Sequence, residues 1–430
     1  MGSSGLNSGD GSETAHLVVL GGGPAGFGVL RALDKHRHDW ARHSVILIDK
    51  DPDVHLGAGA LGSYYTTSDT AGRVFLETAE IGQSLDFGGR SPQPAPLTYL
   101  HKLCDTRSSV SLDVASDLLR IGAAAFLSPR PTPGPQIVKG QVTSIAPRGA
   151  AYSIVVATNE GSYNLKAANV VIAIGGRPWL PVILRAEREK GSHLLHSDAV
   201  LRRDSRYIGC LDALPRKPRI LVIGGSHSAF AATRTLLTEP ISRGWQAGTV
   251  GLVHRHPIRV TYPDVTSAIG AGASFSDADI CSKTGVVFRF AGLRTDSASL
   301  FVRIKRGHEK RVDMRLDRSS ESLLDLCRSA DLIVAATGYT SRASDLISSE
   351  LSPGDDLNAR PRLLVNHDAQ MLDAHGRPRS GLFAIGLGSG ALPDRDRYGG
   401  EYSYSGEVDG VWYYQQAIAP RIVAHIGRAG

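Results

Sequence analysis

Three glycines near the start of the chain have the spacing of a diphosphate-binding turn. Gly21, Gly23 and Gly26 follow an apolar stretch, 16–20, in the pattern G-x-G-x-x-G. The first glycine permits a tight turn, the second lets a pyrophosphate approach the backbone, and the third lets the next helix pack against the strand. The N-terminus of that helix offers unpaired N–H groups to an anion. These residues could hold a dinucleotide. Because such turns are common, the neighbouring strands and motifs must show whether this one binds a nucleotide.

An acidic residue ends the next apolar strand, 44–49, where an adenosine ribose would lie. In dinucleotide-binding folds an acid at this place accepts hydrogen bonds from the ribose hydroxyls. Asp49 comes 28 residues after Gly21, a longer interval than the usual one of about 20. The polar insert 35–43 accounts for the difference. The preceding strand favours ribose binding over the alternative, an ordinary turn residue at a strand end.

A second turn of related pattern follows the apolar strand 219–223. It reads G-x-S-x-x-A, with Gly224, Ser226 and Ala229 at the three positions. A following helix extends to Leu237 and stops before Pro240. The chain therefore repeats its strand–turn–helix unit, and we expect a second nucleotide site here.

Basic residues follow this second turn at the place where the first unit has its acid. The strand 249–253 ends in His254-Arg255-His256. A cation there suits the 2′-phosphate of NADP, whereas an acid would suit the 2′-hydroxyl of NAD. We predict that Arg255 binds this phosphate; the alternative is a solvated charge at a strand end. For His227, inside the turn, a phosphate contact and exposure to solvent are equally compatible with the sequence.

Composition limits the class of protein. The chain has 430 residues, of which 42% are hydrophobic and 21% charged, as in ordinary globular proteins of two or three domains. It lacks an apolar run of about 18 residues, so we expect no membrane-spanning helix. The Gly- and Ser-rich segment 1–14 is expected to be a flexible tail with no signal-peptide core, which makes the cytoplasm the default location. The net charge is +6, but the 48 Lys and Arg are scattered, which argues against a nucleic-acid partner.

The cysteines and histidines indicate neither a redox dithiol nor a metal site. The four cysteines, at positions 104, 210, 281 and 327, form no C-x-x-C pair. The 15 histidines show no metal-ligand spacing. We therefore predict inert thiols and no bound metal.

These residues require a particular set of elements to position them. Helices are expected over 27–36, 97–103, 114–125, 226–237 and 407–426, and a loop over 62–69. Parallel strands are expected at 16–20, 44–49, 169–175, 219–223, 249–253, 331–335 and 381–385, and an antiparallel meander at 140–145, 152–158 and 162–165. The predicted fold class is α/β, with two Rossmann-like domains, one inserted in the other, and a small antiparallel β-meander.

The order of these motifs resembles a known family. After the two turns come an A-x-G-x-x-P-x-x-P segment at 173–181, D-x-x-x-x-A-T-G-Y at 331–339 and G-L-F-x-x-G at 381–386. Together they resemble class B flavin-dependent monooxygenases, closest to the amine and amino-acid N-hydroxylases and the flavin-containing monooxygenases. The stretch 191–196 lacks the leading Phe of the Baeyer–Villiger fingerprint, which argues against that subtype.

The resemblance implies positions for two cofactors, FAD and NADPH. For FAD it implies Gly21, Gly23, Pro24, Ala25, Gly26, Asp49, Lys50, Val142, Ala173, Gly175 and Gly386. For NADPH it implies Gly224, Ser226, His227, Ser228, Ala229 and Arg255, together with Thr337, Gly338 and Tyr339. The implied domains are an FAD-binding domain from 15–212 and 341–430, the second part carrying the C-terminal helix, and an NADPH-binding domain from 216–340.

The resemblance also implies an activity. In these monooxygenases reduced flavin and O2 form a C4a-(hydro)peroxyflavin, which transfers one oxygen atom to a soft nucleophile; here that nucleophile is expected to be a primary amine or amino acid. The acid–base demand is small, so we name no catalytic residue. The loop residues Tyr64, Ser68 and Asp69 are the candidate substrate contacts. A homo-oligomer is compatible with the resemblance.

Two other functions fit the same residues. A flavoprotein reductase could pass electrons from NADPH to a protein or small-molecule acceptor. A nucleotide-binding regulatory protein would retain the turns but not the turnover. The substrate itself is not indicated by the sequence.

Overall fold

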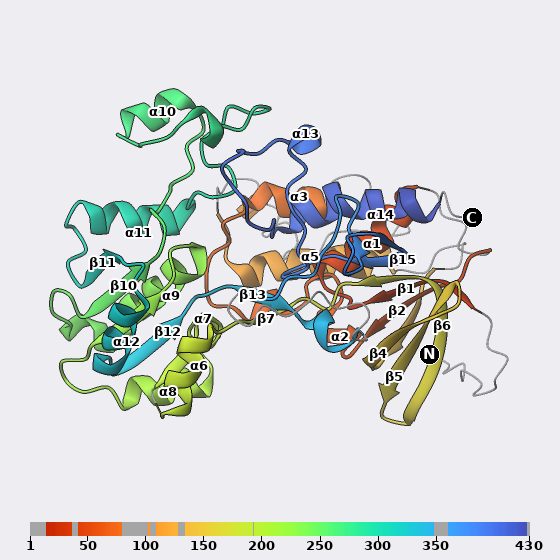
Figure 1. Cartoon of the computed structure of the whole chain (residues 1–430), viewed down its shortest axis with the longest axis horizontal. Coiled ribbons are helices and arrows are strands. Elements are labelled where there is room, and N and C mark those ends of the chain that lie inside the picture. The colour runs from red at the N-terminus through yellow and green to blue at the C-terminus, as the bar shows by residue number, and fades with distance from the viewer. Residues whose placement is uncertain are drawn as a thin grey trace.

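The computed structural model describes residues 14–36, 42–79, 102–103, 109–127, 134–191, 193–347 and 360–427. Two mainly parallel sheets lie at opposite ends of the molecule (Figure 1). Each sheet is flanked by helices, which confirms the predicted α/β class. The predicted tail 1–14 falls almost wholly outside the described residues, as does most of the expected helix 97–103.

The first sheet combines both ends of the chain. Its strand order is β14-β15-β6-β1-β2-β3, and β5 joins β4 to β6. The strands are β1 (Ala15–Leu20), β2 (Val45–Asp49), β3 (Gln136–Lys139), β4 (Gln141–Arg148), β5 (Ala151–Thr158), β6 (Gly161–Ile172), β14 (Gln370–Leu372) and β15 (Pro378–Ala384). Helix α1 packs against α14 and α5, and α5 packs against α3. These helices are α1 (Pro24–Lys35), α3 (Gly72–Ala79), α5 (Leu112–Phe126) and α14 (Ala419–Ile426).

Strand β6 corrects one detail of the sequence interpretation. The segments 162–165 and 169–175 were expected to be separate strands, but both contribute to β6. Its first half pairs antiparallel with β5, and its second half pairs parallel with β1. Backbone pairing continues through the residues between the two segments, because Lys166 and Ala167 pair with β5 and Ala167 also pairs with β1 on the other edge. The backbone groups there are satisfied in extended geometry, so the strand is not interrupted. The meander β4-β5-β6 is confirmed.

The second sheet has the order β11-β10-β9-β12-β8, with every pair parallel. Its strands are β8 (Leu194–His196), β9 (Ile220–Ile223), β10 (Val250–His254), β11 (Val312–Leu316) and β12 (Leu332–Ala335). Its helices are α6 (Val182–Glu189), α7 (Ser197–Arg202), α8 (Ser205–Asp212), α9 (His227–Thr238), α11 (Thr295–Lys305) and α12 (Ser320–Ser329).

Strand β8 lies earlier in the chain than the expected start of the second unit. The sequence interpretation placed 194–196 with the first domain, whereas β8 pairs with β12 of the second sheet. Tyr207 and Leu211 of α8 are buried in the core of that same unit. The segment has only three strand residues, too few to give a readable period. The bounds of the two domains remain predictions.

The remaining elements connect or extend the two units. The antiparallel pair β7 (Gly176–Pro178) and β13 (Tyr339–Ser341) lies between the sheets (Figure 1). Short pieces include α2 (Pro52–His55), α10 (Val265–Gly270), α13 (Arg395–Tyr398) and the 3₁₀ turns Leu61–Ser63, Pro240–Gly244, Asp277–Asp279 and Arg342–Asp345. Helix α10 protrudes from the second unit at the upper left of Figure 1.

The C-terminal helix is shorter than expected. It was predicted from 407, but residues 407–410 are non-helical, and a π-helix, Tyr413–Ile418, precedes α14. The glycines at 406 and 410 disfavour a helix in this entry segment, and the buried Glu407 within it pairs with Arg360 at 2.7 Å. Helix α3, which follows the expected loop 62–69, was not predicted from the sequence.

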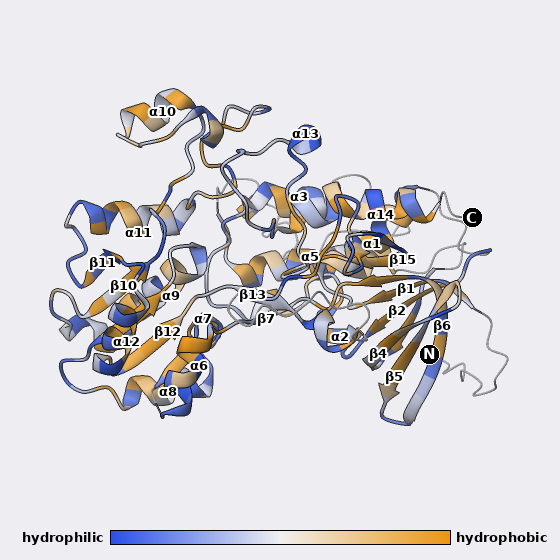
Figure 2. Ribbon diagram, viewed as in Figure 1, coloured by the Kyte–Doolittle hydropathy of each residue, from blue (hydrophilic) through white to orange (hydrophobic). Residues whose placement is uncertain are grey.

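Apolar side chains form a separate core on each sheet. Leu17, Val19 and Phe383 are buried between the first sheet and its helices, and Val222 and Leu252 between the second sheet and its helices. Figure 2 shows hydrophobic strands at the centre of both units and hydrophilic segments at the exposed tip of β5 and β6. Within the described residues, the helices are too short or too polar to cross a membrane.

Candidate functional site

The two glycine turns are built in the same way. Gly21 and Gly224 follow β1 and β9 with φ of +96° and +145°, a backbone region that favours glycine. A Cβ on Gly21 would lie 2.5 Å from the Ala173 carbonyl oxygen, and one on Gly224 would lie 2.5 Å from that of Ala336. In each unit the chain therefore turns tightly against the end of a neighbouring parallel strand, where nucleotides bind in such folds.

The first turn forms a cradle made of backbone. A Cβ on Gly26 would lie 1.9 Å from the Gly21 carbonyl oxygen, so this position requires glycine. Gly23 begins α1, with Pro24 in its first turn. The Gly57 N–H donates to the Gly22 carbonyl at 2.8 Å, which adds a second glycine segment beside the turn. The absence of side chains leaves the N-terminus of α1 open to a pyrophosphate, and this surface fits FAD.

Asp49 lies directly under the first turn. Its carboxylate is 7% exposed and accepts hydrogen bonds from Gly22 N at 2.7 Å and Asp51 N at 2.8 Å. His55 Nδ1 lies 2.9 Å from the same carboxylate. Asp49 thus braces the turn, and its remaining lone pairs can still accept a ribose hydroxyl. Lys50, next in the chain, is exposed.

The other residues assigned to FAD lie at the end of the first sheet or beside it. Ala173 follows β6, and Gly175 has a left-handed φ of +73°. Gly386 follows β15, where an added Cβ would approach Ala25 of α1 to 3.4 Å. These residues surround the turn. Val142 instead lies buried on β4 in the meander core.

The second turn leaves room for an anion at the start of α9. Ser226 is the N-cap and is exposed, while Ala229 is fully buried in the first turn of the helix. Arg255 follows β10 and is exposed. Arg318 Nε donates to the Arg255 carbonyl at 3.1 Å, so a second cation lies nearby. Arg318 was missed because it follows β11, where no motif marked it. This surface fits a phosphorylated nucleotide such as NADPH.

The A-T-G-Y segment joins the two units. The Thr337 hydroxyl donates to the Trp179 carbonyl, and the Tyr339 hydroxyl donates to Asp198. Tyr64 of the first unit donates to the other oxygen of Asp198 at 3.0 Å and accepts from Arg202 at 2.7 Å. The hydroxyls of Tyr64 and Tyr339 are thus engaged by the protein, and their contacts with substrate or cofactor remain predictions.

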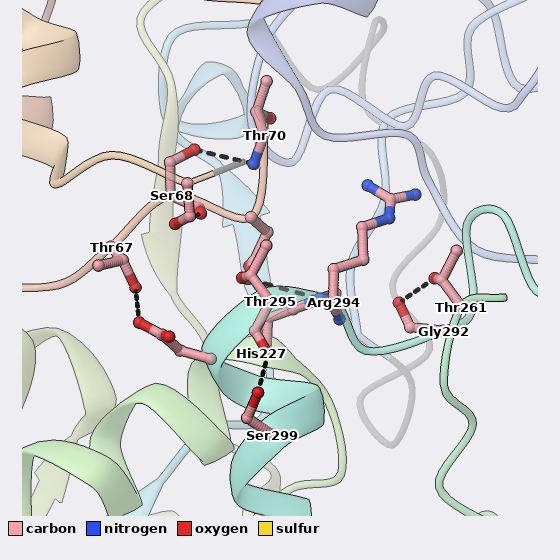
Figure 3. A network of polar contacts seen from close by, with 12 residues as sticks. Thr67, Ser68, Thr70, His227, Thr261, Gly292, Arg294, Thr295 and Ser299 are labelled. Carbon is pink, nitrogen blue, oxygen red and sulfur yellow. Dashed lines mark hydrogen bonds and ion pairs between the residues drawn. The ribbon is translucent and has the colours of Figure 1, made fainter. Parts of the chain in front are cut away.

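The other two candidate substrate residues belong to the loop 67–70, which lies close to His227 in the second turn (Figure 3). The Ser68 N–H donates to the Val110 carbonyl at 2.7 Å, and its Oγ accepts from Thr70 N at 2.9 Å. Asp69 lies between these two anchors, and its Oδ1 lies 3.6 Å from His227 Nε2. The structure therefore brings Asp69 of the first unit to the helix that begins at the second turn.

Burial changes the protonation of this pair. His227 Nε2 accepts the Arg294 backbone N–H at 3.1 Å, which leaves the proton on Nδ1 in the neutral ring. Burial, together with the charge of Arg294, lowers the pKa of His227 to about 4. Burial raises the pKa of Asp69 to about 7, although Arg294 acts in the opposite direction. A carboxyl with this pKa can bind a cation or accept a proton near neutral pH.

Two residues of this cluster were missed in the sequence. Arg294 is the last residue before α11 and Thr295 is its first residue, and the long segment between β10 and α11 carries neither a periodic pattern nor a motif. Their distance from Asp69 in the chain also hides the contact. Within the described residues, no cluster of three or more His, Cys, Asp or Glu has the geometry of a metal site.

Comparisons with known proteins agree with this architecture. Residues 15–386 match the family described as pyridine nucleotide-disulphide oxidoreductase. A curated relative, the CMP-5′-(3-aminopropyl)phosphonate hydroxylase of Streptomyces rubellomurinus, is 28% identical over 426 residues, covering 94% of this chain and 96% of that protein.

Solved structures share the fold over nearly the whole chain. The ornithine N-hydroxylase of Kutzneria sp. 744, solved with reduced FAD, NADP⁺ and L-ornithine, superposes with a TM-score of 0.57 at 16% identity, covering 97% of this chain and 100% of that one. The L-lysine 6-monooxygenase of Pseudomonas syringae has a TM-score of 0.57 at 18% identity, covering 96% and 99%. At these identities the likeness establishes the fold.

Proposed function

The chain belongs to the pyridine nucleotide-disulphide oxidoreductase family, and on that premise we propose that it is an FAD- and NADPH-dependent monooxygenase that hydroxylates the nitrogen of a primary amine. One observation carries the proposal, the match over almost the full length of both chains to a hydroxylase whose named substrate contains a 3-aminopropyl group. The fold shared with ornithine and lysine hydroxylases supports it.

Each cofactor has a surface that fits it. The turn 21–26 and Asp49 would hold the pyrophosphate and ribose of FAD, and the turn 224–229 with Arg255 would hold NADPH. When bound, the flavin supplies the redox chemistry with O2, and the protein supplies position and exclusion of water. Asp69 and His227 lie where the two units meet, so they would line the space that receives the amine.

The cysteines do not favour a dithiol reductase. Its chemistry needs two thiols close enough to form a disulfide, but no two cysteines of this chain lie within a C-x-x-C spacing. Cys281 and Cys327 are buried and carry free thiols. Location in the cytoplasm and assembly into a homo-oligomer remain predictions from the sequence.

The test is a product analysis of the FAD-loaded enzyme. With NADPH, O2 and 3-aminopropylphosphonate or its CMP ester, we expect NADPH oxidation stimulated by the amine and a product heavier by one oxygen atom. Labelling from ¹⁸O2 would identify the source of that oxygen. Stoichiometric reduction of an added electron acceptor, with no oxygen incorporated into the amine, would instead establish a reductase and refute the proposal.

A further inference from the structure

Two opposite charges lie close together at the junction of the units without forming an ion pair. Asp69 comes from the first unit, and Arg294 comes from the segment before α11 (Figure 3). The Oγ1 of Thr295, the residue after Arg294, lies 3.4 Å from Asp69 Oδ1. The charge of Arg294 acts to lower the pKa of Asp69, and the charge of Asp69 acts to raise the pKa of Arg294. No ion pair within 4.0 Å joins them in the described part of the chain, and no other described carboxylate pairs with Arg294.

The Asp69 carboxylate has unused hydrogen-bonding capacity. Its side chain is 34% exposed. Oδ1 accepts a long hydrogen bond from Thr295 Oγ1 at 3.4 Å, and its neighbour His227 is neutral at physiological pH. Among the described residues, Oδ2 accepts no hydrogen bond from a side chain or the backbone. A carboxylate so placed lacks a charged ion-pair partner among the described residues and keeps an oxygen free for a ligand.

The Arg294 guanidinium is desolvated, and it makes no ion pair within 4.0 Å in the described part of the chain, although the charges of Asp69 and Glu401 oppose the lowering of its pKa by burial. Figure 3 shows it directed away from His227, and its Nη2 donates to the Arg289 carbonyl. Burial lowers the pKa of Arg294, and the nearby charge of Arg289 acts in the same direction. Its ordinary pKa is so high that it stays charged. One backbone carbonyl does not satisfy its donors, which match a carboxylate or phosphonate in geometry.

The backbone holds Arg294 in this position at a cost. Thr295 has a φ of +45°, a left-handed conformation that is strained for a β-branched residue. The Glu401 carboxylate, which is fully buried, accepts hydrogen bonds from Phe290 N at 2.8 Å and Ala291 N at 2.7 Å. This carboxylate ties the segment 288–295 to the C-terminal part of the chain.

From this geometry we propose that Asp69 and Arg294 are the two poles of the substrate site, where Asp69 binds the ammonium group and Arg294 binds an oxyanion carried by the same molecule. This inference rests on the proposed function and assigns its substrate to the zwitterionic amines that bear a phosphonate or carboxylate. The fit follows from charge complementarity, because the substrate would supply each pole with the partner that it lacks.

The Asp69 pole also has a chemical role. The amine nitrogen needs its lone pair to accept oxygen, but it enters as an ammonium ion. Transfer of one proton from that nitrogen to Asp69 Oδ2 leaves a neutral amine and a neutral carboxyl, so charge and protons balance. The raised pKa of this carboxyl makes it a better proton acceptor than an ordinary aspartate.

Binding to the oxidised, FAD-loaded enzyme without NADPH tests the inference by calorimetry. The probes are 3-aminopropylphosphonate, which has both charges, and propylamine and propylphosphonate, which have one each. The wild type should bind the zwitterion at least about tenfold more tightly than either half. Arg294→Gln should weaken zwitterion binding by about 10- to 100-fold and leave the affinity for propylamine unchanged. Asp69→Asn should weaken zwitterion binding by a similar factor and leave the affinity for propylphosphonate unchanged.

Matched variants control for general effects of charge. Arg306→Gln removes an exposed arginine just beyond α11, and Asp53→Asn an exposed aspartate in α2. Both should bind all three probes as the wild type does. A parallel titration with 4-aminobutyrate compares the two oxyanions, and we expect the phosphonate to bind more tightly because it carries more negative charge.

Unchanged zwitterion binding in either site variant would overturn the inference. It would also be overturned if Arg294→Gln weakened NADP⁺ binding alone, because Arg294 would then serve the nucleotide. These outcomes are separable from the proposed function. The predicted binding pattern without a hydroxylated product would refute the monooxygenase but support the zwitterion site. A hydroxylated product without the binding pattern would support the monooxygenase but refute the zwitterion site.

Discussion

At the scale of single residues, the Asp69 carboxyl makes stability depend on pH. Its pKa is raised to about 7 in the folded chain, whereas an unfolded aspartate titrates near 3.9. The folded state therefore favours the protonated form. That contribution to stability is present below about pH 4 and is lost as the pH rises through about 7.

We accordingly expect the stability of Asp69→Asn, relative to that of the wild type, to increase as the pH rises. The asparagine remains neutral, so the difference in melting temperature between variant and wild type should increase from pH 5 to pH 8. Scanning fluorimetry of the FAD-loaded proteins measures it, with Asp53→Asn as the control. A difference that stays constant with pH would contradict the raised pKa.

Arg255 provides a second prediction at this scale. If it binds the 2′-phosphate, Arg255→Ala should raise the KM for NADPH by about 10- to 100-fold, the range of a charge-assisted contact, and leave the KM for NADH unchanged. Steady-state kinetics with both nucleotides decide the matter. An equal increase in the KM for NADPH and for NADH would assign Arg255 to another role. The variant Arg306→Ala controls for the loss of an exposed arginine.

Residues that follow a strand and a glycine turn could be predicted, and residues in irregular segments could not. The spacing of Gly21 and Gly26 reflects a steric requirement that is local in the chain. Arg294 is held near Asp69 because Thr295, which contacts Asp69, adopts a strained backbone and Glu401 fixes the segment from far along the chain. Neither cause leaves a pattern in the sequence.

At the scale of elements, the first helix and its turn tolerate no added atom at Gly26. A Cβ there would lie 1.9 Å from the Gly21 oxygen, so Gly26→Ala must displace the helix or the turn, at a cost of about 1–3 kcal/mol or more. We expect the purified variant to retain less than about a tenth of its FAD, measured by absorbance.

The second turn provides the comparison. Ala229 occupies the corresponding position of α9 and is accommodated there. Ala229→Gly should leave FAD content unchanged and cost only about 0.5–1 kcal/mol of stability. Equal FAD content in Gly26→Ala and the wild type would show that the turn is less constrained than its geometry indicates.

Regular elements of both units followed from apolar patterning, and exceptions have local causes. The buried strands β1, β2, β9 and β12 were predicted within a residue or so of their bounds. β8 was missed because it is three residues long, and β6 was divided because its partner changes along its length. The length of β8 is a local property, whereas the change of partner along β6 is not encoded in its own segment.

At the scale of the molecule, the first unit depends on the end of the chain. Tyr413, Ile418, Ile422, Val423 and Ile426 are buried against α1 and its neighbours. Each such side chain contributes about 1.5–3 kcal/mol, so together they approach the whole stability of a typical domain.

A chain that ends after residue 410 should therefore lose FAD and become sensitive to limited proteolysis between 15 and 172. A chain that ends after residue 427 keeps every described contact of α14 and should behave as the wild type. Retention of FAD by the shorter chain would show that the last helices are dispensable.

The strand order of the first sheet has a consequence for synthesis on the ribosome. β1 emerges among the first residues, but β15, which completes the parallel sheet beside β6, comes only at 378–384. The second sheet is complete once β12 has emerged at residue 335. The unit that begins first is thus finished last. β6 ends at residue 172, and its edge stays without its partner β15 for some two hundred further residues, about 10–40 s at ordinary elongation rates. This makes the early part of the chain the segment most in need of a chaperone.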